Sequence, residues 1–252
     1  MPKKIIDHND QEARAYNWVL LATFILLISL VIQTPARLAA RFLPAHAQTA
    51  ISAWGGSLWS GQVNGHYKTW QGQLTWQLKP LSLLRLKIGV DWALITAQSH
   101  AHGELYLGLN GWQLAHTQGQ LAATDIQSLL SGWQLPNMPI AIENISLDYQ
   151  KKQWQQAAGL LSWQGGELDY VFNGQRQHVN LPPVRMTVSA EKDALVMTLN
   201  EQQGANLAHF VLTGMNLESR LTQRLLAYSP SYRGVAEPDA IVVTATQPIS
   251  SL

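Results

Sequence analysis

The amino-acid sequence predicts a mainly β protein, in which an N-terminal transmembrane helix is followed by a twisted, largely antiparallel β-sheet domain with one or two short helices. Three observations support this prediction. A single long apolar run lies near the N-terminus, apolar and polar residues alternate with a period of two over much of the later chain, and turn-forming residues separate the alternating segments. The roughly 215 residues after the run are enough for one sizeable β domain or two small ones with a hydrophobic core.

The apolar run, Trp18 to Ile32, is the first element of the prediction. As a helix it would cover only about 22 Å, which is less than the roughly 30 Å of a bilayer core. Uncharged flanking residues, Ala15 to Asn17 and Gln33 to Thr34, extend the neutral stretch to about 20 residues. Pro35 then ends the helix. We therefore predict a membrane anchor.

A cleaved secretory signal is the alternative interpretation of this run, because Ala45-His46-Ala47 has the small-x-small pattern of a cleavage site. Ala45 lies thirteen positions after Ile32, however, and Arg37 and Pro44 fall within that interval. A cleavage site normally follows the apolar region closely. The spacing therefore favours an uncleaved anchor.

The charges around the run favour an N-terminus in the cytoplasm. Lys3, Lys4 and Arg14 precede the run, whereas only Arg37 and Arg41 follow it closely. A long C-terminal domain would then lie outside the cytoplasm, which in a Gram-negative cell means the periplasm. The predicted segments are a cytoplasmic tail (1–17), a transmembrane helix (18–34), a neck (35–49), a periplasmic β-rich domain (50–246) and a flexible tail (247–252).

Period-two alternation predicts the strands of the domain. The predicted strands cover residues 74–79, 84–94, 104–109, 145–149 and 168–172, and Ile241–Ala245 is the last. A hairpin is expected where Met186–Ala190 meets Leu195–Leu199 across a turn at Glu191-Lys192-Asp193. Many consecutive strands with few helices indicate an antiparallel sheet with one apolar face.

Two segments have helical spacing instead. In the first, Ile126, Leu129 and Leu130 follow Thr124-Asp125. In the second, 217–226, four leucines follow Asn216 and the pattern ends at Pro230. Both helices are expected to be short.

Composition excludes several classes of function. The formal net charge is +1 and only 13% of residues are charged, so the chain has no basic surface suited to nucleic acid. The chain has no cysteine, which excludes disulfides and cysteine-based metal or nucleophile sites.

Residues that could carry chemistry are few. His100 and His102 would share one strand face, as metal ligands sometimes do, but no third ligand is adjacent in sequence. Glu167 and Asp169 would also share a face, and a solvated edge that discourages strand pairing is the favoured interpretation. No nucleophile elbow, phosphate-binding glycine loop or His-Glu-x-x-His motif occurs. We therefore predict no catalytic residue, no metal ligand and no cofactor, and no enzymatic activity.

A recurring combination of tryptophan and glycine is the most distinctive feature of the domain. The candidate structural or binding motif consists of Trp59, Gly61, Trp76, Pro80 and Trp163. Buried aromatic residues dominate core energetics, so the tryptophans are better interpreted as sheet anchors than as a ligand box. The alternative is an aromatic-lined groove.

In four segments the chain resembles the type II secretion system protein N family. The order of these segments carries the resemblance; they are Gly56–Gly61, Trp76–Leu81, Ala158–Trp163 and Pro238–Asp239. The resemblance implies a single-pass inner-membrane protein with a periplasmic β-rich domain, accessory to the machinery that exports folded exoproteins across the outer membrane. It also implies other type II secretion components as partners, besides the lipid bilayer. It supplies no catalytic residue.

Three functional hypotheses follow. The favoured one is a non-enzymatic subunit that acts through contacts of exposed strand edges or apolar patches. The second is a membrane-tethered lipid-binding or lipid-transfer module, whose curved sheet would hold acyl chains on its apolar face. The two differ in one structural feature, because an adaptor should cover that face with the segments 126–130 and 217–226, whereas a lipid module should leave an open groove. A hydrolase using Glu167 and Asp169, or a His100 and His102 metal site, is the third and least favoured.

Overall fold

The computed structural model describes residues 18, 21–23, 29, 33–42, 50–67, 70–127, 133–134, 138–172, 175–191 and 193–248. Most of the predicted transmembrane segment, 18–34, lies outside the described residues. Among the residues that are described, no helix is long and apolar enough to cross a membrane.

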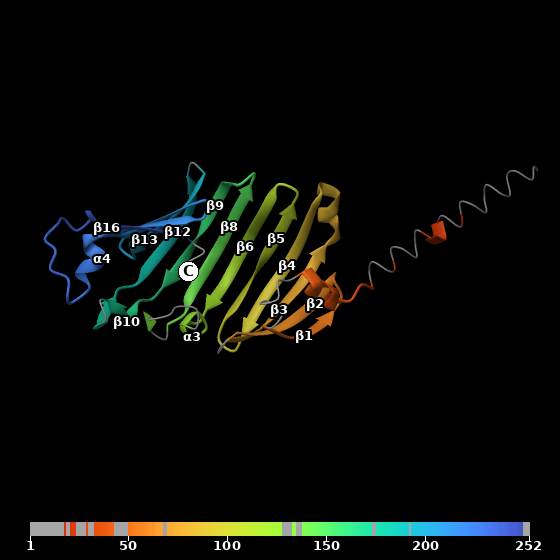
Figure 1. The fold of residues 1–252 in the computed structure, drawn as a ribbon, viewed down its shortest axis with the longest axis horizontal. Helices are drawn as coiled ribbons and strands as arrows, with labels where there is room; N and C mark the ends of the chain where they lie inside the picture. The colour runs from red at the N-terminus through yellow and green to blue at the C-terminus, as the bar shows by residue number, and fades with distance from the viewer. Residues whose placement is uncertain are drawn as a thin grey trace, which may run out of the picture.

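A single antiparallel sheet of thirteen strands forms most of the molecule (Figure 1). Neighbouring strands in this sheet are also neighbours in sequence, except at two excursions where the chain leaves the large sheet. The first lies between β6 and β8, and the second between β9 and β12. The strands, in order across the sheet, are β1 (Ile51–Gly56), β2 (Ser60–Tyr67), β3 (Trp70–Lys79), β4 (Lys87–Thr96), β5 (His100–Gly108), β6 (Gly111–Leu121), β8 (Ile140–Gln150), β9 (Gln153–Trp163), β12 (Val184–Glu191), β13 (Ala194–Glu201), β14 (Asn206–Thr213), β15 (Asn216–Thr222) and β16 (Ile241–Pro248). The predicted meander-like sheet is confirmed.

The second excursion contributes to a small sheet of three strands, β7 (Trp133–Gln134), β10 (Gly166–Phe172) and β11 (Gln175–Leu181). Its order is β11-β10-β7, so β10 is paired on both sides. The interpretation of a strand-blocking edge is therefore wrong for Asp169, which pairs with Gln134 of β7 as well, whereas Glu167 has no partner on β7 among the described pairs. Both residues lie on the central strand, where Glu167 pairs with Asn180 and Asp169 with His178.

Helical segments are short: η1 (Ala36–Phe42), η2 (Pro80–Arg85), α3 (Ala123–Gln127) and α4 (Gln223–Ala227). Helix α3 begins where a helix is predicted. The helix predicted over 217–226 is wrong in its first half, because Asn216–Thr222 forms β15 and pairs with both β14 and β16. Thr222 accepts a hydrogen bond from the Leu225 N–H and starts α4 there.

The strand predicted over 84–94 begins later than expected. Lys79 pairs with Gly89, so the chain between them must reverse direction. Pro80 occupies the first turn of η2, and Leu86 ends it in the left-handed conformation with φ of 54°. Leu84 and Leu86 therefore belong to a connection and not to β4. The predicted hairpin at 186–199 is confirmed, since Met186 pairs with Leu199 and Ala190 with Leu195.

The register of the large sheet defines one continuous apolar face, because directly paired residues of antiparallel strands project from the same side. A chain of such pairs crosses the sheet from β1 to β16: Trp54–Val63, Val63–Leu74, Leu74–Leu94, Val90–Leu105, Leu105–Leu114, Leu114–Leu147, Leu147–Ala157, Leu161–Met186, Met186–Leu199, Leu199–Ala208, Ala208–Leu221 and Leu221–Val243. The opposite face carries polar residues such as Gln77, Asp91 and Glu104. The sequence predicts this division through its period of two.

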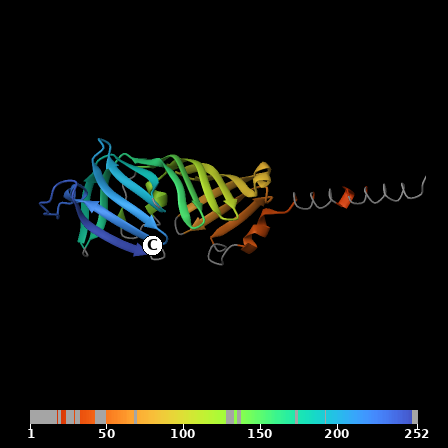
Figure 2. The same ribbon diagram turned by 90° about the horizontal axis from the view of Figure 1, so that it is seen from above.

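The hydrophobic core lies toward the C-terminal half of the sheet. Ile145, Val188 and Leu195 form its buried centre, and α4 packs mainly against β14 and β15. Figure 2 shows the sheet curving round at this end, whereas the N-terminal strands spread toward the end where the chain enters. The N-terminal corner is therefore the more open part of the molecule.

Candidate functional site

The candidate site lies at this N-terminal corner, where Trp76 of β3 packs across β2. Its indole N–H donates to the Leu58 carbonyl at 3.0 Å, which fixes the turn between β1 and β2. The ring also meets Trp54 edge to face, with 6.2 Å between centroids. Gly61 pairs directly with Trp76, and a Cβ on Gly61 would lie 2.4 Å from Trp76 Cζ2. Only glycine leaves room for the ring here.

Two more members of the predicted motif lie beside this contact. The Trp59 carbonyl accepts a hydrogen bond from the Leu78 N–H at 2.7 Å, which joins the β1–β2 turn to the end of β3. Pro80 follows immediately and opens η2. The structure therefore brings Trp59, Gly61, Trp76 and Pro80 to one corner.

Trp163 does not join them. It ends β9, where it pairs with Ile140 of β8 and Val184 of β12, four strands beyond β4 in the sheet order. It lies among neighbours that differ from those of the corner. The tryptophan and glycine residues of the predicted motif therefore do not all belong to one site.

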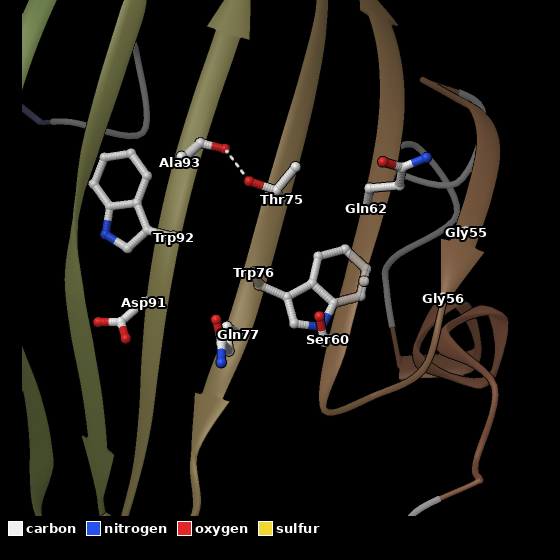
Figure 3. Close-up of a pocket in the computed structure, with 11 residues that line it drawn as sticks. Gly55, Gly56, Ser60, Gln62, Thr75, Trp76, Gln77, Asp91, Trp92 and Ala93 are labelled. Carbon is white, nitrogen blue, oxygen red and sulfur yellow. Dashed lines mark hydrogen bonds between the residues drawn. The ribbon is translucent and has the colours of Figure 1, made fainter.

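A shallow groove of about 460 Å³ opens beside Trp76 (Figure 3). Backbone at Gly55 and Gly56 forms one wall, and side chains of Gln62, Asp91 and Trp92 complete the lining. Figure 3 shows the Trp76 ring lying beside Ser60, with the Thr75 hydroxyl directed at the Ala93 carbonyl. The lining combines two tryptophans, Trp76 and Trp92, with polar side chains and one carboxylate, that of Asp91. Of the tryptophans in the predicted motif, only Trp76 lines this groove, and ligand binding at the motif stays a prediction.

A charged cluster, Lys79, Asp91, Glu104 and Tyr106, ties together β3, β4 and β5 on the polar face. Lys79 Nζ lies 2.7 Å from Asp91 and 3.0 Å from Glu104. The Tyr106 hydroxyl donates to Glu104 at 2.6 Å. The cluster lines a hollow of about 890 Å³ beneath η2.

The contacts of this cluster shift the pKa of its members. Burial by itself lowers the pKa of Lys79, but hydrogen bonds to Asp91, Glu104 and Tyr106 outweigh burial and raise the pKa above its ordinary value. The Tyr106 hydrogen bond, and then that of Lys79, lowers the pKa of Glu104. The same bond to Glu104 raises the pKa of Tyr106. These shifts keep Lys79 protonated, Glu104 ionised and Tyr106 a neutral hydrogen-bond donor, so the cluster is a structural clasp and not a poised acid or base.

Sequence reasoning missed this clasp. Lys79, Asp91 and Glu104 each occupy polar positions of the alternating pattern, so a polar face was predictable. Their meeting depends on strand register, in which Asp91 pairs with both Gln77 and Glu104. The alternation disfavours a one-residue slip, which would move every side chain of a strand to the other face, but a two-residue slip keeps the faces and would still separate these three residues.

The remaining candidates form two separate places. His100 and His102 lie on β5 and project from one face as expected, yet no group of three or more possible ligands lies together in the described part of the chain. Asp169 lies 2.6 Å from His178 Nδ1, and Glu167 lies 3.9 Å from its Nε2. The hydrogen bond to Asp169 raises the pKa of His178. This trio has no nucleophile beside it among the described hydrogen bonds.

A family model for the type II secretion system (T2SS), protein N, matches residues 47–221. The chain belongs to that family. The matched part begins before β1 and ends in β15, so it contains the tryptophan corner, the charged cluster and the apolar face. No curated protein and no solved structure matches the chain.

Membership in this family implies an accessory component of type II secretion. The resemblance found in the sequence is thereby confirmed. The family is not known for enzymatic activity. Other components of the same machinery are plausible partners, and an envelope location is consistent with membership.

Proposed function

We propose that this protein is a non-enzymatic inner-membrane subunit of the type II secretion system that supports export of folded exoproteins through protein contacts in the periplasm. Residues 18–34 would anchor it, and residues 50–246 would form the periplasmic domain. The family match over residues 47–221 carries the proposal. The apolar run Trp18–Ile32 supports the anchor.

An open strand edge supports contact with a partner protein. β16 is the last strand of the large sheet and pairs only with β15 among the described strands. Ile241 and Val243 on this strand are exposed. At the opposite edge, η1 packs beside β1 and β2. β16 is therefore the better position for an added strand from another subunit, which would be held by main-chain hydrogen bonds.

Photocrosslinking in intact secreting cells tests this proposal. A photoreactive residue at Thr244, on the exposed edge strand, is expected to give adducts with other type II secretion components. The same residue at Gln202, in the exposed turn between β13 and β14, is the matched control and is expected to give none. Absence of adducts at both positions, with normal exoprotein export in cells lacking the protein, would contradict the adaptor function.

A second candidate function, a lipid-binding or lipid-transfer module, is favoured by one observation. The apolar face crosses the whole sheet, and in the N-terminal half its side chains Leu74, Ile88 and Leu107 remain 38%, 47% and 43% exposed. The segment 217–226 does not cover it as expected, since most of that segment is strand and the main contacts of α4 are with β14 and β15. Most of the other expected cover, 126–130, lies outside the described residues. A curved, uncovered apolar face suits acyl chains.

Mass spectrometry of lipid retained by the purified full chain tests this candidate. Leu74→Asp, which places a charge on the apolar face, is expected to reduce retained lipid several-fold. Gln73→Asp adds the same charge on the opposite face of the same strand and is the matched control. Equal lipid in both variants would argue against the lipid function and leave the adaptor function standing.

A further inference from the structure

Connection η2 and the neighbouring β5–β6 turn expose an unusual number of leucines. The five residues, which we call the leucine lip, are Leu81, Leu83, Leu84, Leu86 and Leu109. Their exposed fractions are 76%, 46%, 83%, 77% and 89%. Single exposed apolar residues are ordinary, but five within two adjacent connections make a contiguous patch that indicates an interaction surface.

The lip is held in place and is not a frayed loop. Ser82 is buried; its hydroxyl donates to the Lys79 carbonyl at 2.6 Å and accepts from the Gly89 N–H at 2.7 Å. These two bonds tie both ends of η2 to the sheet. Pro80 further restricts its first turn. The leucines are therefore presented to solvent by a fixed backbone, which reduces the entropic cost of binding.

The two connections of the lip touch each other. Lys87 pairs with Gly108 at the adjoining ends of β4 and β5. Leu86 and Leu109 line one shallow cavity of about 200 Å³ between the connections. The lip is consequently one surface and not two separate loops.

Four cations surround the leucine lip. Arg85 and Lys87 flank Leu86, while Lys151 and Lys152 form the β8–β9 turn. That turn adjoins the lip, because the Lys151 N–H donates to the Asn110 carbonyl at 2.8 Å. None of the four makes an ion pair with a carboxylate in the described part of the chain. The nearby carboxylates, Asp91 and Glu104, form their ion pairs with Lys79.

The lip lies at the end of the sheet where the predicted anchor joins the domain. The Leu58 N–H donates to the Thr34 carbonyl at 2.9 Å, and the Leu78 N–H donates to the Trp59 carbonyl at 2.7 Å. Thr34 is thus about two strand spacings, or roughly 10 Å, from the start of η2. Figures 1 and 2 both place η2 at the end of the sheet where the N-terminal segment enters.

We propose that the leucine lip is a second membrane contact, which inserts into the interface of an anionic phospholipid bilayer while Arg85, Lys87, Lys151 and Lys152 bind lipid phosphates. The inference rests on the proposed anchor, because the anchor delivers the lip to the bilayer surface. Exposed leucines bordered by unpaired cations match a membrane interface, where apolar groups enter the acyl boundary and cations meet anionic headgroups. The core of a protein interface, by contrast, is depleted in lysine. The contact would fix the orientation of the sheet relative to the membrane.

Fluorescence of a single introduced cysteine tests the contact, since the chain has no cysteine of its own. The full chain carrying Leu84→Cys is labelled with an environment-sensitive dye and reconstituted in vesicles of phosphatidylethanolamine and phosphatidylglycerol. Val235→Cys, at a residue that is 98% exposed and near α4, is the matched control. We expect the dye at position 84 to shift to the blue and to be quenched at least twofold more strongly by doxyl-labelled acyl chains than the dye at position 235.

Charge reversal sharpens the test. Arg85→Glu with Lys87→Glu is expected to remove most of the difference between the two dye positions, and omission of phosphatidylglycerol should do the same. Arg185→Glu with Arg233→Glu makes an equal change of charge at exposed residues away from the lip and is expected to leave the difference intact.

Vesicle flotation separates failure of the lip from failure of the anchor. If the chain floats with vesicles in alkaline carbonate but the dye at position 84 behaves like that at 235, the anchor stands and the lip proposal is overturned. If the chain does not float, the anchor fails and so does the membrane role of the lip. Protein adducts without lipid adducts from a photoreactive residue at Leu84 would also overturn the proposal, in favour of a partner protein.

Discussion

The two halves of the large sheet carry the same alternation of apolar and polar residues but bury it differently. On the apolar face of β3, β4 and β5, Leu74, Ile88 and Leu107 remain substantially exposed. On the same face of β12 and β13, Val188 and Leu195 are only 8% and 7% exposed and form the core with Ile145. Alternation therefore decides which face is apolar, and the curvature of the sheet decides how much of that face is hidden.

The comparison also separates two ways of holding strands together. The C-terminal half is stabilised by burial of apolar side chains. The N-terminal half depends more on particular local contacts, which are the Trp76 ring over Gly61, the Lys79 cluster and the Ser82 tie. A half that is left open can present surface to a membrane, a lipid or a partner.

Leucine-to-alanine substitution is expected to show the largest difference between the halves. Leu195→Ala removes buried side-chain volume from the core and should lower the free energy of unfolding by about 2–5 kcal/mol. Leu74→Ala removes the same atoms from a half-open face and should cost less than about 1.5 kcal/mol. Urea unfolding of the purified full chain in detergent measures both. Equal losses would contradict the assignment of the core to the C-terminal half.

Gly61→Ala tests the packing of the tryptophan corner. The new Cβ would lie 2.4 Å from the Trp76 ring and 2.7 Å from the Ser57 carbonyl, so the corner must shift at a cost of about 1–3 kcal/mol. Gly108→Ala is the control, because its Cβ would have its nearest neighbours at 3.7 Å, an ordinary van der Waals distance. Thermal unfolding compares the two variants. A Gly61→Ala protein as stable as the control would mean that the corner is loosely packed.

Removal of the cation from the charged cluster is expected to have a smaller effect. Lys79→Met leaves Asp91 and Glu104 without their cation and should lower the free energy of unfolding by about 1–2 kcal/mol at neutral pH. Lys87→Met, without a carboxylate partner in the described part of the chain, should change it by less than about 0.5 kcal/mol. If both variants lose the same free energy of unfolding, the charged cluster does not stabilise the fold.

The same pair of variants predicts a pH dependence. The pKa of Glu104 is lowered in the folded state, so its contribution to stability is present above the ordinary value of 4.5 and is lost as pH falls through the lowered pKa. Lys79→Met should reduce the stability lost on acidification, because one of the two hydrogen bonds that lower this pKa is removed. Unfolding curves between neutral and acid pH measure the change, and an acid dependence identical to that of the parent would refute it.

The smallest expected effect concerns His178 in the three-stranded sheet. Its hydrogen bond to Asp169 raises its pKa, so the stabilisation is present below the ordinary value of 6.5 and is lost as pH rises through the raised pKa. Asp169→Asn should return the pKa toward its ordinary value, whereas Glu167→Gln, at the longer distance of 3.9 Å, should lower it less. NMR titration of the His178 ring measures both shifts. Equal changes in the pKa of His178 in the two variants would mean that Asp169 is not the main cause of the raised pKa.

The sequence by itself determined the sheet, its two faces and the hairpin at 186–199, because a period of two and turn residues are local signals. It also led to the family, since Gly56–Gly61 and Trp76–Leu81 stand in order along the chain. The start of β4 and the whole of β15 were not predicted correctly. Leucines at 84 and 86 fit a strand, and those of 217–226 fit a helix, until pairing with neighbouring strands decided between them.

Only the tertiary structure decided which residues meet. Trp59, Gly61, Trp76 and Pro80 share a corner while Trp163 lies apart, and Lys79 reaches Asp91 and Glu104, because strand register brings distant positions opposite one another. The exposure of the leucine lip has the same origin. Apolar residues in a local pattern predict burial, but burial requires a neighbour to cover them, and these leucines remain exposed in the described part of the chain.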